Sequence, residues 1–393
     1  MKHFKLFTAT LFAIALTLVI MVGCKKTTEE SKSLSKDEQS LKGPNSIAGR
    51  DNSLMGSSEF CYPETSRSIE TGIPGVSKSV AQYSVVYYTD YVSAGVGGMR
   101  NVGSGTIALA GVSGSVTKAY LYWHGITNST TNTGNPITVN ATTVTGTNIG
   151  ISSDNCWLFN NSQAYRADVT SMVQATGNGN YALSGFGGLN PNGASLIVFF
   201  NDGDYTNNRD VVIFDGNDSN VPFAGIAGNP DAPADPFGWN VLLSGINYTS
   251  GSANMQLHVA DGQTFADAPL LINTLPFVAG PAIFQGNSVP GGAGPTGNGN
   301  LWDIKTYSVT SFLSPGPNSL NLTTGQVNDC LGLIVALVDL PTGSAPGFPY
   351  CGNNGDKIQV CHNSGPNGPK TLCVDWLGLA DHIAHGDKIG PCN

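Results

Sequence analysis

Residues 165–200 read YRADVTSMVQATGNGNYALSGFGGLNPNGASLIVFF. A related pattern returns in residues 305–338, which read KTYSVTSFLSPGPNSLNLTTGQVNDCLGLIVALV. In each copy, Val-Thr-Ser and two apolar residues precede a Gly/Pro/Asn turn, a short alternating strand, a second turn and an apolar run. Long internal similarity of this kind is typical of two copies of one structural unit. We therefore predict an ordered body made of two paired β-sandwich halves.

The strands expected around these copies follow a period of two. In residues 116–123, Ala119, Leu121 and Trp123 lie on one face of a strand, and tyrosines lie on the other. Residues 195–200 are continuously apolar, which is typical of a strand that is covered on both faces. Glycine, asparagine and proline separate such stretches, and helical periodicity is nearly absent. The pattern predicts an all-β fold of two packed, jelly-roll-like sandwich halves.

Composition limits the classes of function. Only 11% of the 393 residues are charged, whereas ordinary soluble domains have about 25%. The net charge is −9 and basic residues are scarce, so the chain lacks the positive surface that nucleic-acid binding requires. Few charges and many turn-forming residues favour an extracellular all-β protein over a helical cytosolic enzyme.

The first 23 residues are interpreted as a targeting signal rather than as part of the folded protein. Lys2 and Lys5 precede an uncharged apolar stretch at residues 6–22, and a glycine then precedes Cys24. A stretch of this length could also span a bilayer, so a retained anchor is the alternative. The Met-Val-Gly-Cys end resembles the lipobox of bacterial lipoprotein signals, although methionine replaces the preferred leucine. The resemblance implies that Cys24 becomes a lipidated N-terminus, which holds the protein in the bacterial envelope, at the outer membrane or cell surface.

The rest of the chain divides by composition. Residues 25–54 are polar, carry charges of both signs and lack apolar periodicity, so they are expected to form a flexible tether. Proline and glycine concentrate again in a later linker. We therefore expect, in order, a signal peptide (1–23), a tether (24–76), a paired sandwich body (77–340, with halves of about 77–215 and 216–340), a linker (341–349) and a Cys/His-rich module (350–393).

Each repeated Val-Thr-Ser segment is interpreted as a short helical turn that closes one end of a sandwich. A polar side chain before each segment caps a single helical turn, two apolar residues plug the sandwich, and a turn then reverses the chain. The expected caps are Asp168 and Ser308, and the expected plugs are Met172 with Val173 and Phe312 with Leu313.

These segments resemble the Asp-Val-Thr turn of galactose-binding-like jelly rolls, which include accessory domains of glycoside hydrolases. The region 83–340 also resembles a repeated domain of bacterial and archaeal surface proteins that has no settled function. The motifs that carry this resemblance are a KAYLYW-x-G strand at residues 118–125, an ADVT turn at residues 167–170 and a DCL strand at residues 329–331. The resemblance implies a fold and a surface location, but no activity.

Two segments of the body offer candidate ligand sites. Trp123 and His124 end a strand and are interpreted either as a carbohydrate-binding surface or, for Trp123, as part of the core. Asp202, Asp204 and Asp210 lie in one oxygen-rich segment. That segment suggests either a calcium site or a plain acidic turn, because the residue order of an EF-hand is missing.

No catalytic pattern stands out in the sequence, which has no G-x-S-x-G elbow and no H-E-x-x-H motif. Glutamate is nearly absent after the tether, so a pair of catalytic glutamates, as in many glycosidases, is excluded. We expect a non-enzymatic, lipid-anchored surface protein that binds a glycan or a matrix protein. A purely structural component of the envelope or biofilm matrix is the alternative, and a hydrolase is less favoured.

The C-terminal module is too small to be stable by apolar burial alone and needs disulfides or a metal. Residues 357–361 and 370–374 are expected to pair as a hairpin, and residues 376–385 are expected to form a helix. The pattern V-C-H … T-x-C-V … H-x-x-H-G-D-x-x-G-x-C resembles a short module at the C-terminus of surface proteins from Bacteroidota-like bacteria. Its biochemical role is not settled.

Two interpretations of the cysteines and histidines remain open. In the first, the cysteines form disulfides, which an extracellular address and an even count favour. In the second, two histidines on one face of a helix join other side chains around zinc or copper, although the protein needs no cofactor to explain its fold. The disulfide candidates are Cys156 and Cys330, as a pair across the halves, and Cys351, Cys361, Cys373 and Cys392. The metal candidates are Cys361, His362, Cys373, His382, His385 and Cys392.

Overall fold

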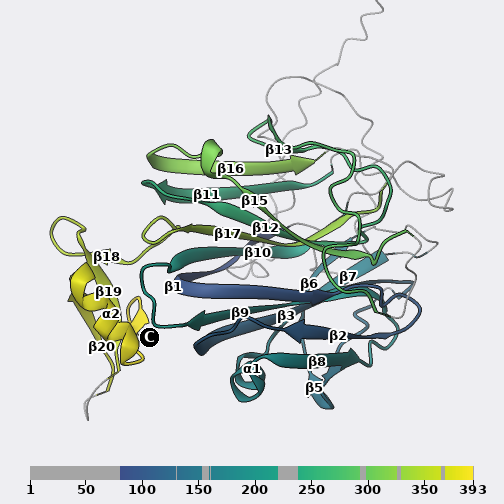
Figure 1. The fold of residues 1–393 in the computed structure, drawn as a ribbon, viewed down its shortest axis with the longest axis horizontal. Coiled ribbons are helices and arrows are strands. Elements are labelled where there is room, and N and C mark those ends of the chain that lie inside the picture. The colour runs from purple at the N-terminus through teal and green to yellow at the C-terminus, as the bar shows by residue number, and fades with distance from the viewer. Residues whose placement is uncertain are drawn as a thin grey trace, which may run out of the picture. The chain divides into compact units, whose positions relative to one another are not determined.

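The computed structural model describes residues 80–129, 131–152, 159, 161–219, 238–292, 298–324, 329–363 and 368–392. Within these ranges the chain consists mainly of antiparallel strands, with two short α-helices and one 3-10 helix (Figure 1). The all-β fold of packed sandwich halves and the small C-terminal module are therefore confirmed. The predicted signal peptide, Cys24 and the tether lie outside the described residues.

The largest element is a nine-stranded sheet that runs through both halves of the body. Its strands, in spatial order, are β15 (Trp302–Ser308), β12 (Asn254–Ala260), β17 (Gly332–Pro341), β10 (Arg209–Ser219), β1 (Ala81–Val96), β9 (Asn190–Asn201), β3 (Ser115–Thr127), β7 (Asn161–Asp168) and β6 (Thr147–Ser152).

Two four-stranded sheets accompany the large sheet. The sheet of the first half consists of β2 (Ser104–Leu109), β8 (Gly179–Ser184), β4 (Ile137–Val139) and β5 (Thr142–Val144). The sheet of the second half consists of β11 (Asn240–Tyr248), β16 (Gly316–Thr324), β13 (Leu270–Ile272) and β14 (Leu275–Val278).

Strand β1 joins the two halves because its two ends pair with different neighbours. Its first part, residues 81–89, pairs with β10, and its second part, residues 90–96, pairs with β9. The change of partner coincides with a register shift between Val86 and Thr89 and with a left-handed backbone at Tyr88 (φ 54°). A single long strand therefore belongs to both sandwiches.

The two halves of the nine-stranded sheet fold over to face each other. Tyr122 of β3 donates a hydrogen bond of 3.0 Å to Asp215 of β10, and Trp302 of β15 donates one of 2.8 Å to Ser195 of β9. From top to bottom, Figure 1 thus shows four layers: the β11–β16 sheet, the β15–β12–β17–β10 strands, the β1–β9–β3–β7–β6 strands and the β2–β8 sheet.

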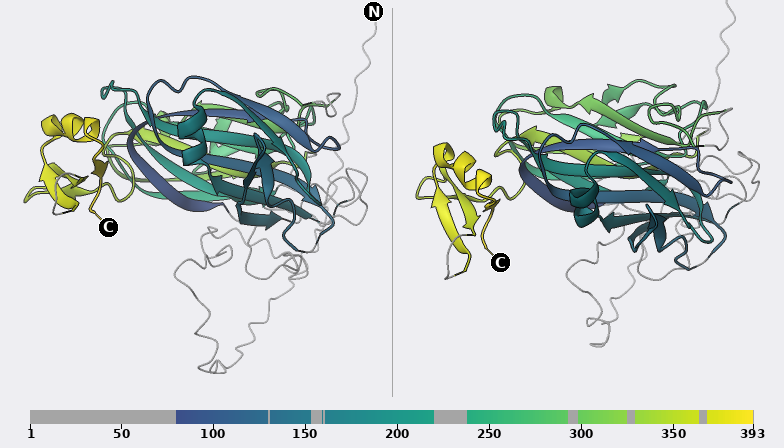
Figure 2. Two further views of the ribbon diagram at one scale, coloured as in Figure 1. Left: turned by 90° about the horizontal axis from the view of Figure 1, so that it is seen from below. Right: turned by 60° about the horizontal axis from the view of Figure 1, so that its bottom comes forward.

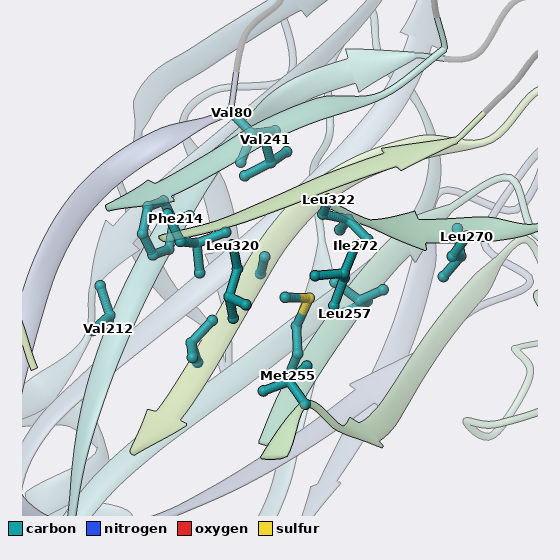
Figure 3. Close-up of a cluster of buried hydrophobic side chains, with 14 of the residues drawn as sticks. Val80, Val212, Phe214, Val241, Met255, Leu257, Leu270, Ile272, Leu320 and Leu322 are labelled. Carbon is teal, nitrogen blue, oxygen red and sulfur yellow. The ribbon is translucent and has the colours of Figure 1, made fainter. Parts of the chain in front are cut away.

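Three apolar cores lie between these four layers. The alternation in β3 explains how one strand serves two of them: Ala119, Leu121 and Trp123 enter the first-half core, and Tyr120 and Tyr122 enter the central core. The second-half core, shown in Figure 3, includes Val212, Phe214, Met255, Leu257, Leu320 and Leu322. Both faces of the large sheet are therefore covered.

Strand β10 continues across residues 215/216, where the approximate boundary between the two halves is expected. Asp215 and Gly216 both lie inside β10, which pairs with β17 on one side and with β1 on the other. The side chain of Asp215 explains why a polar residue is tolerated there, because it accepts hydrogen bonds from Tyr122 and Arg166. Side chains of the first half thus satisfy the Asp215 carboxylate, although Asp-Gly is a sequence typical of turns.

The repeated Val-Thr-Ser segments form α1 (Thr170–Thr176) in the first half and a 3-10 helix (Thr310–Phe312) in the second. In both copies the threonine hydroxyl accepts a hydrogen bond from an alanine amide of a neighbouring segment, Ala119 (3.0 Å) or Ala253 (2.9 Å). The preceding Val169 or Val309 donates its own amide to the carbonyl of that same alanine. This shared pair of bonds docks each turn against its sandwich and accounts for the repeat.

The expected caps and plugs of these segments are only partly correct. The N-cap positions are Val169 and Val309, and neither has a side-chain capping bond. Asp168, which lies one residue before the N-cap position, nevertheless accepts a hydrogen bond of 2.9 Å from the amide of Thr170. The most deeply buried residues of the two segments are Val169, Val173, Val309 and Leu313, whereas Met172 and Phe312 are partly buried against the cores.

The C-terminal module forms its own sheet and helix, drawn in yellow in Figure 2. Four residues, Phe348, Ile358, Val360 and Leu379, form its small buried core. Its elements are β18 (Tyr350–Cys351), β19 (Lys357–His362), β20 (Lys370–Val374), α2 (Trp376–Ala384) and β21 (Lys388–Ile389).

Candidate functional site

Trp123 does not form a carbohydrate-binding surface. Its side chain is completely buried, its ring stacks on Tyr165 with 5.3 Å between centroids, and its Nε1 donates a hydrogen bond of 3.0 Å to the carbonyl of Gly134. The core interpretation of Trp123 is therefore correct. The β2–β8–β4–β5 sheet covers the face of β3 on which this tryptophan lies, and a single strand cannot reveal that cover.

His124 is also buried, in a polar region where strands of both halves end. Arg100, which follows β1, forms an ion pair of 2.6 Å with Asp261, which follows β12, and so links the two halves. Arg100 also donates a hydrogen bond of 2.9 Å to Asn192. Burial, and after it the charge of Arg100, lowers the pKa of His124 to about 3. His124 is therefore neutral at physiological pH and inaccessible to a ligand at the surface.

Asp329, just before β17, is the most strongly perturbed acid of this polar region. Burial raises its pKa to about 9, and the charges of Asp261 and Asp267 add to the effect. One carboxylate oxygen accepts a hydrogen bond of 2.8 Å from the amide of Cys330, and the other has no hydrogen-bond partner among the described residues. A protonated, neutral carboxyl fits such a site at neutral pH.

Asp329 should therefore make stability depend on pH. The folded state keeps a proton up to about pH 9, whereas an unfolded aspartate loses it near pH 4. The contribution of Asp329 to the free energy of unfolding is expected to be fully present below pH 4 and to fall as the pH rises from about 4 to 9, by up to ~1.4 kcal/mol per pH unit. Urea unfolding at several pH values measures this slope. Asp329→Asn should flatten it, and an unchanged slope in this variant would count against the assignment.

The three aspartates of the calcium prediction do not come together. Asp202 and Asp204 lie in the exposed loop between β9 and β10, where they accept hydrogen bonds from the amides of Asp204 and Thr206. Asp210 lies in β10 and is fully buried. Among the described residues, only one group of three potential metal ligands converges, and it contains none of these aspartates. The plain-turn interpretation describes Asp202 and Asp204.

Asp210 instead anchors the linker to the body. Its carboxylate accepts hydrogen bonds from the amides of Gly343 (2.7 Å), Ala345 (3.4 Å) and Tyr88 (3.1 Å). Burial nevertheless raises its pKa to about 6. The linker segment that leads to the C-terminal module is thereby fastened to β1 and β10.

The cysteines of the C-terminal module form two disulfides, Cys351–Cys373 and Cys361–Cys392. The disulfide interpretation of these four cysteines is confirmed, and Cys361, Cys373 and Cys392 are wrong as metal ligands because a disulfide sulfur is not a thiolate. Cys330 is also in a disulfide. Its predicted partner, Cys156, lies outside the described residues.

The convergent group of the module consists of His362, His382 and Asp387. Nδ1 of His362 and Nδ1 of His382 lie 2.6 and 2.7 Å from the same carboxylate oxygen, Oδ2 of Asp387. The other oxygen, Oδ1, accepts a hydrogen bond of 2.9 Å from the amide of Asn363. The carboxylate is 2% exposed, whereas the two histidine side chains are 26% and 23% exposed, so the group opens to solvent on its histidine side.

The local sequence explains how these side chains meet. Helix α2 ends at Ala384. Gly386 then adopts a left-handed backbone conformation (φ 86°), which is unfavourable for any residue that has a side chain. The chain turns back there, and β21 then pairs with β19. This turn brings Asp387 beneath His382 of α2 and beside His362 at the end of β19. His385, a predicted ligand, occupies the C-cap, is exposed and lies outside the group.

The hydrogen bonds that surround Asp387 keep it ionised. Burial by itself raises the pKa of a carboxyl, but hydrogen bonds from His362, from the Asn363 amide and from His382 outweigh it and lower the pKa of Asp387 to about 2. The sequence pattern H-G-D contains this aspartate, but the spacing of the histidines and cysteines does not indicate that it contacts two of the histidines. The sequence signal for this residue is an aspartate directly after a turn glycine in a segment rich in histidine and cysteine.

An aromatic cluster with two exposed members, Tyr350 and Trp376, lies on the same module. Phe348 stacks on Trp376 with 5.8 Å between centroids, and Tyr350 packs against both rings. Trp376 is 40% exposed, Tyr350 is 39% exposed, and the neighbouring Leu377 is 97% exposed. These residues form an apolar surface at the start of α2 that sequence reasoning did not single out.

Comparisons with known proteins place the chain in no family. No protein-family model matches it, and no curated protein matches it. Among solved structures, a peptide-N(4)-(N-acetyl-β-D-glucosaminyl)asparagine amidase is 10% identical, and the match covers 66% of this chain and 98% of the amidase chain with a TM-score of 0.19. A likeness this weak carries no argument. None of the helices in the described ranges has the length and apolar character needed to cross a membrane.

Proposed function

We propose that the protein is a non-catalytic binding protein of the bacterial envelope, in which the double sandwich is a scaffold and the C-terminal module recognises a carbohydrate. The observation that carries this proposal is the pair of exposed aromatic side chains, Tyr350 and Trp376, which pack against the buried Phe348 on a module with two disulfides. Tryptophan and tyrosine present a large apolar face with a polar edge at a low cost in conformational entropy. Such a face suits stacking on a sugar ring.

The burial of polar groups in the body supports the scaffold role. His124 and His258 are fully buried, and Asp210, Asp267 and Asp329 lie inside the sandwich. Side chains in these positions affect the stability of the fold, but they cannot contact a carbohydrate at the surface. The binding surface is therefore assigned to the module, where aromatic and titratable side chains are partly exposed.

Lipid attachment at Cys24 is part of the same proposal. The tether that follows Cys24 is polar and about 50 residues long, enough for the body to stand clear of the membrane surface. Anchoring at one end and recognition at the other suit an adhesion role in the envelope or matrix.

Trp376→Ala is expected to weaken glycan binding about 10–30-fold, as for an interface hot spot worth about 1.5–2 kcal/mol. The measurement is binding of the full chain, in non-ionic detergent, to an array of immobilised glycans and to a panel of matrix proteins. Leu242→Ala is the matched control, because Leu242 is an exposed apolar side chain (50%) on β11, outside the module. A free-thiol count equal to that of the unmodified chain in each variant shows that the two disulfides of the module remain formed.

Three outcomes oppose the proposal in different ways. Unchanged glycan binding by Trp376→Ala would remove the aromatic cluster from the site. Equal losses in Trp376→Ala and Leu242→Ala would indicate nonspecific adsorption. No binding to any glycan or matrix protein by the unmodified chain would favour a purely structural envelope component.

A further inference from the structure

We propose that His362, His382 and Asp387 bind one divalent transition-metal ion, of the chemical class to which zinc belongs. The three side chains come from β19, from α2 and from the turn before β21. This inference goes beyond carbohydrate recognition and does not depend on it, because it concerns a different set of side chains and uses a metal ion alone as its probe.

The geometry of the group is close to that of a metal site. Its three ligand atoms all lie within 4.8 Å of one another, and the two imidazole rings meet edge to face with 5.3 Å between centroids. Both Nδ1 atoms lie 2.6–2.7 Å from Oδ2 of Asp387. A tetrahedral ion with bonds of about 2.0–2.2 Å separates its ligand atoms by about 3.3 Å. Each nitrogen must therefore move about 0.7 Å away from Oδ2, and the two nitrogens must lie about 3.3 Å from each other, which side-chain rotation can supply.

The donor set selects the class of ion. Two imidazole nitrogens and one carboxylate oxygen suit zinc, iron, nickel or copper, whereas calcium and magnesium prefer oxygen ligands only. Coordination through Nδ1 requires that this nitrogen carry no proton, so an ion would replace the two contacts between the imidazoles and Asp387. The ionised Asp387 supplies one negative charge against the two of the cation.

The surroundings hold the three ligands in place. The amide of Asn363 fixes the second carboxylate oxygen of Asp387, which is the kind of outer-shell hydrogen bond that orients metal-binding carboxylates. The disulfide Cys361–Cys392 lies next to His362, and Gly386 sets the turn before Asp387. With three protein ligands and a solvent-exposed histidine side, the ion keeps a position for water or for an oxygen of a bound partner.

The alternative is that Asp387 only joins the two imidazoles by hydrogen bonds, and a metal titration separates the two. The full chain in non-ionic detergent is stripped with EDTA, dialysed against zinc at several concentrations and assayed by elemental analysis. We expect about one zinc ion per chain, and an affinity at least about 10-fold lower in His382→Gln and in His362→Gln. Cobalt as a second probe should give the strong visible absorption of a four-coordinate ion, which weak surface binding does not.

His385→Gln is the matched control, because His385 lies three residues after His382 yet outside the group. It should bind zinc and cobalt like the unmodified chain. A free-thiol count and near-ultraviolet circular dichroism in EDTA show whether each variant keeps the module folded, and Asp387→Asn provides a further ligand variant if one histidine variant does not. The proposal is overturned if the unmodified chain binds no more zinc than His382→Gln, or if His385→Gln loses as much affinity.

Discussion

Replacing Trp123 by alanine is expected to lower the free energy of unfolding by about 3–5 kcal/mol, one of the largest effects that a single substitution can have in this body. The side chain is completely buried in the first-half core and stacks on Tyr165. Its loss leaves a cavity and also leaves the carbonyl of Gly134 without the hydrogen bond from Nε1. The backbone of Gly146 approaches the same ring so closely that a Cβ there would lie 2.3 Å from it. Because this side of the cavity is backbone, no side chain at Gly146 can move in to fill the space.

The measurement is urea unfolding of the unmodified chain and of Trp123→Ala, monitored by far-ultraviolet circular dichroism. Trp376→Ala is the control with the same substitution, because Trp376 is 40% exposed and belongs to the module. Its effect on the transition of the body should be below about 0.5 kcal/mol. If Trp123→Ala lost less than about 1 kcal/mol and instead weakened glycan binding, Trp123 would be a ligand-binding residue after all.

Removing the disulfides of the C-terminal module should have the second large effect. The loops closed by Cys351–Cys373 and Cys361–Cys392 span 22 and 31 residues, and each cross-link is expected to stabilise the module by about 3–4 kcal/mol. Among the described residues, the buried apolar core of the module consists of only four side chains, so apolar burial gives it little reserve. The chain with Ser at all four of these positions should therefore keep a folded body and lose the folded module.

Limited proteolysis followed by mass spectrometry measures this loss. Cleavage within residues 350–393 should become rapid in the variant without disulfides, while the body remains resistant. Variants that lack only one disulfide should be intermediate, and reduction of the unmodified chain should reproduce the full effect. A module that stays resistant without either disulfide would show that its small core suffices.

The fold was accessible from the sequence where local pattern and tertiary packing agree. The two Val-Thr-Ser copies predict paired sandwiches, and Thr170 and Thr310 make the same hydrogen bond in each half. The position of Asp215 was not accessible, because Tyr122 and Arg166 satisfy its carboxylate from strands far away in the chain. A lone strand also does not reveal that its second face is covered, as β3 shows at Trp123.

The candidate site was accessible only in part. His362 and His382 stand out because histidine and cysteine are dense in the module, but their spacing does not show which sulfur atoms are oxidised. The disulfides exclude Cys361 and Cys392 from the ligand set. Asp387 joins the site through the left-handed turn at Gly386, and Asp210 leaves the expected calcium loop because its side chain points into the body. The positions of Asp387 and Asp210 depend on where the backbone turns and on which face of a strand a side chain lies, and residue spacing alone determines neither.

The proposed metal site of the C-terminal module is tested most directly by X-ray anomalous scattering at the zinc edge, from crystals of the full chain grown with zinc. We predict one strong peak at about 2.0–2.2 Å from Nδ1 of His362, Nδ1 of His382 and a carboxylate oxygen of Asp387. An ordered module without a peak between these three side chains, or with a peak only at His385, would contradict the proposed site.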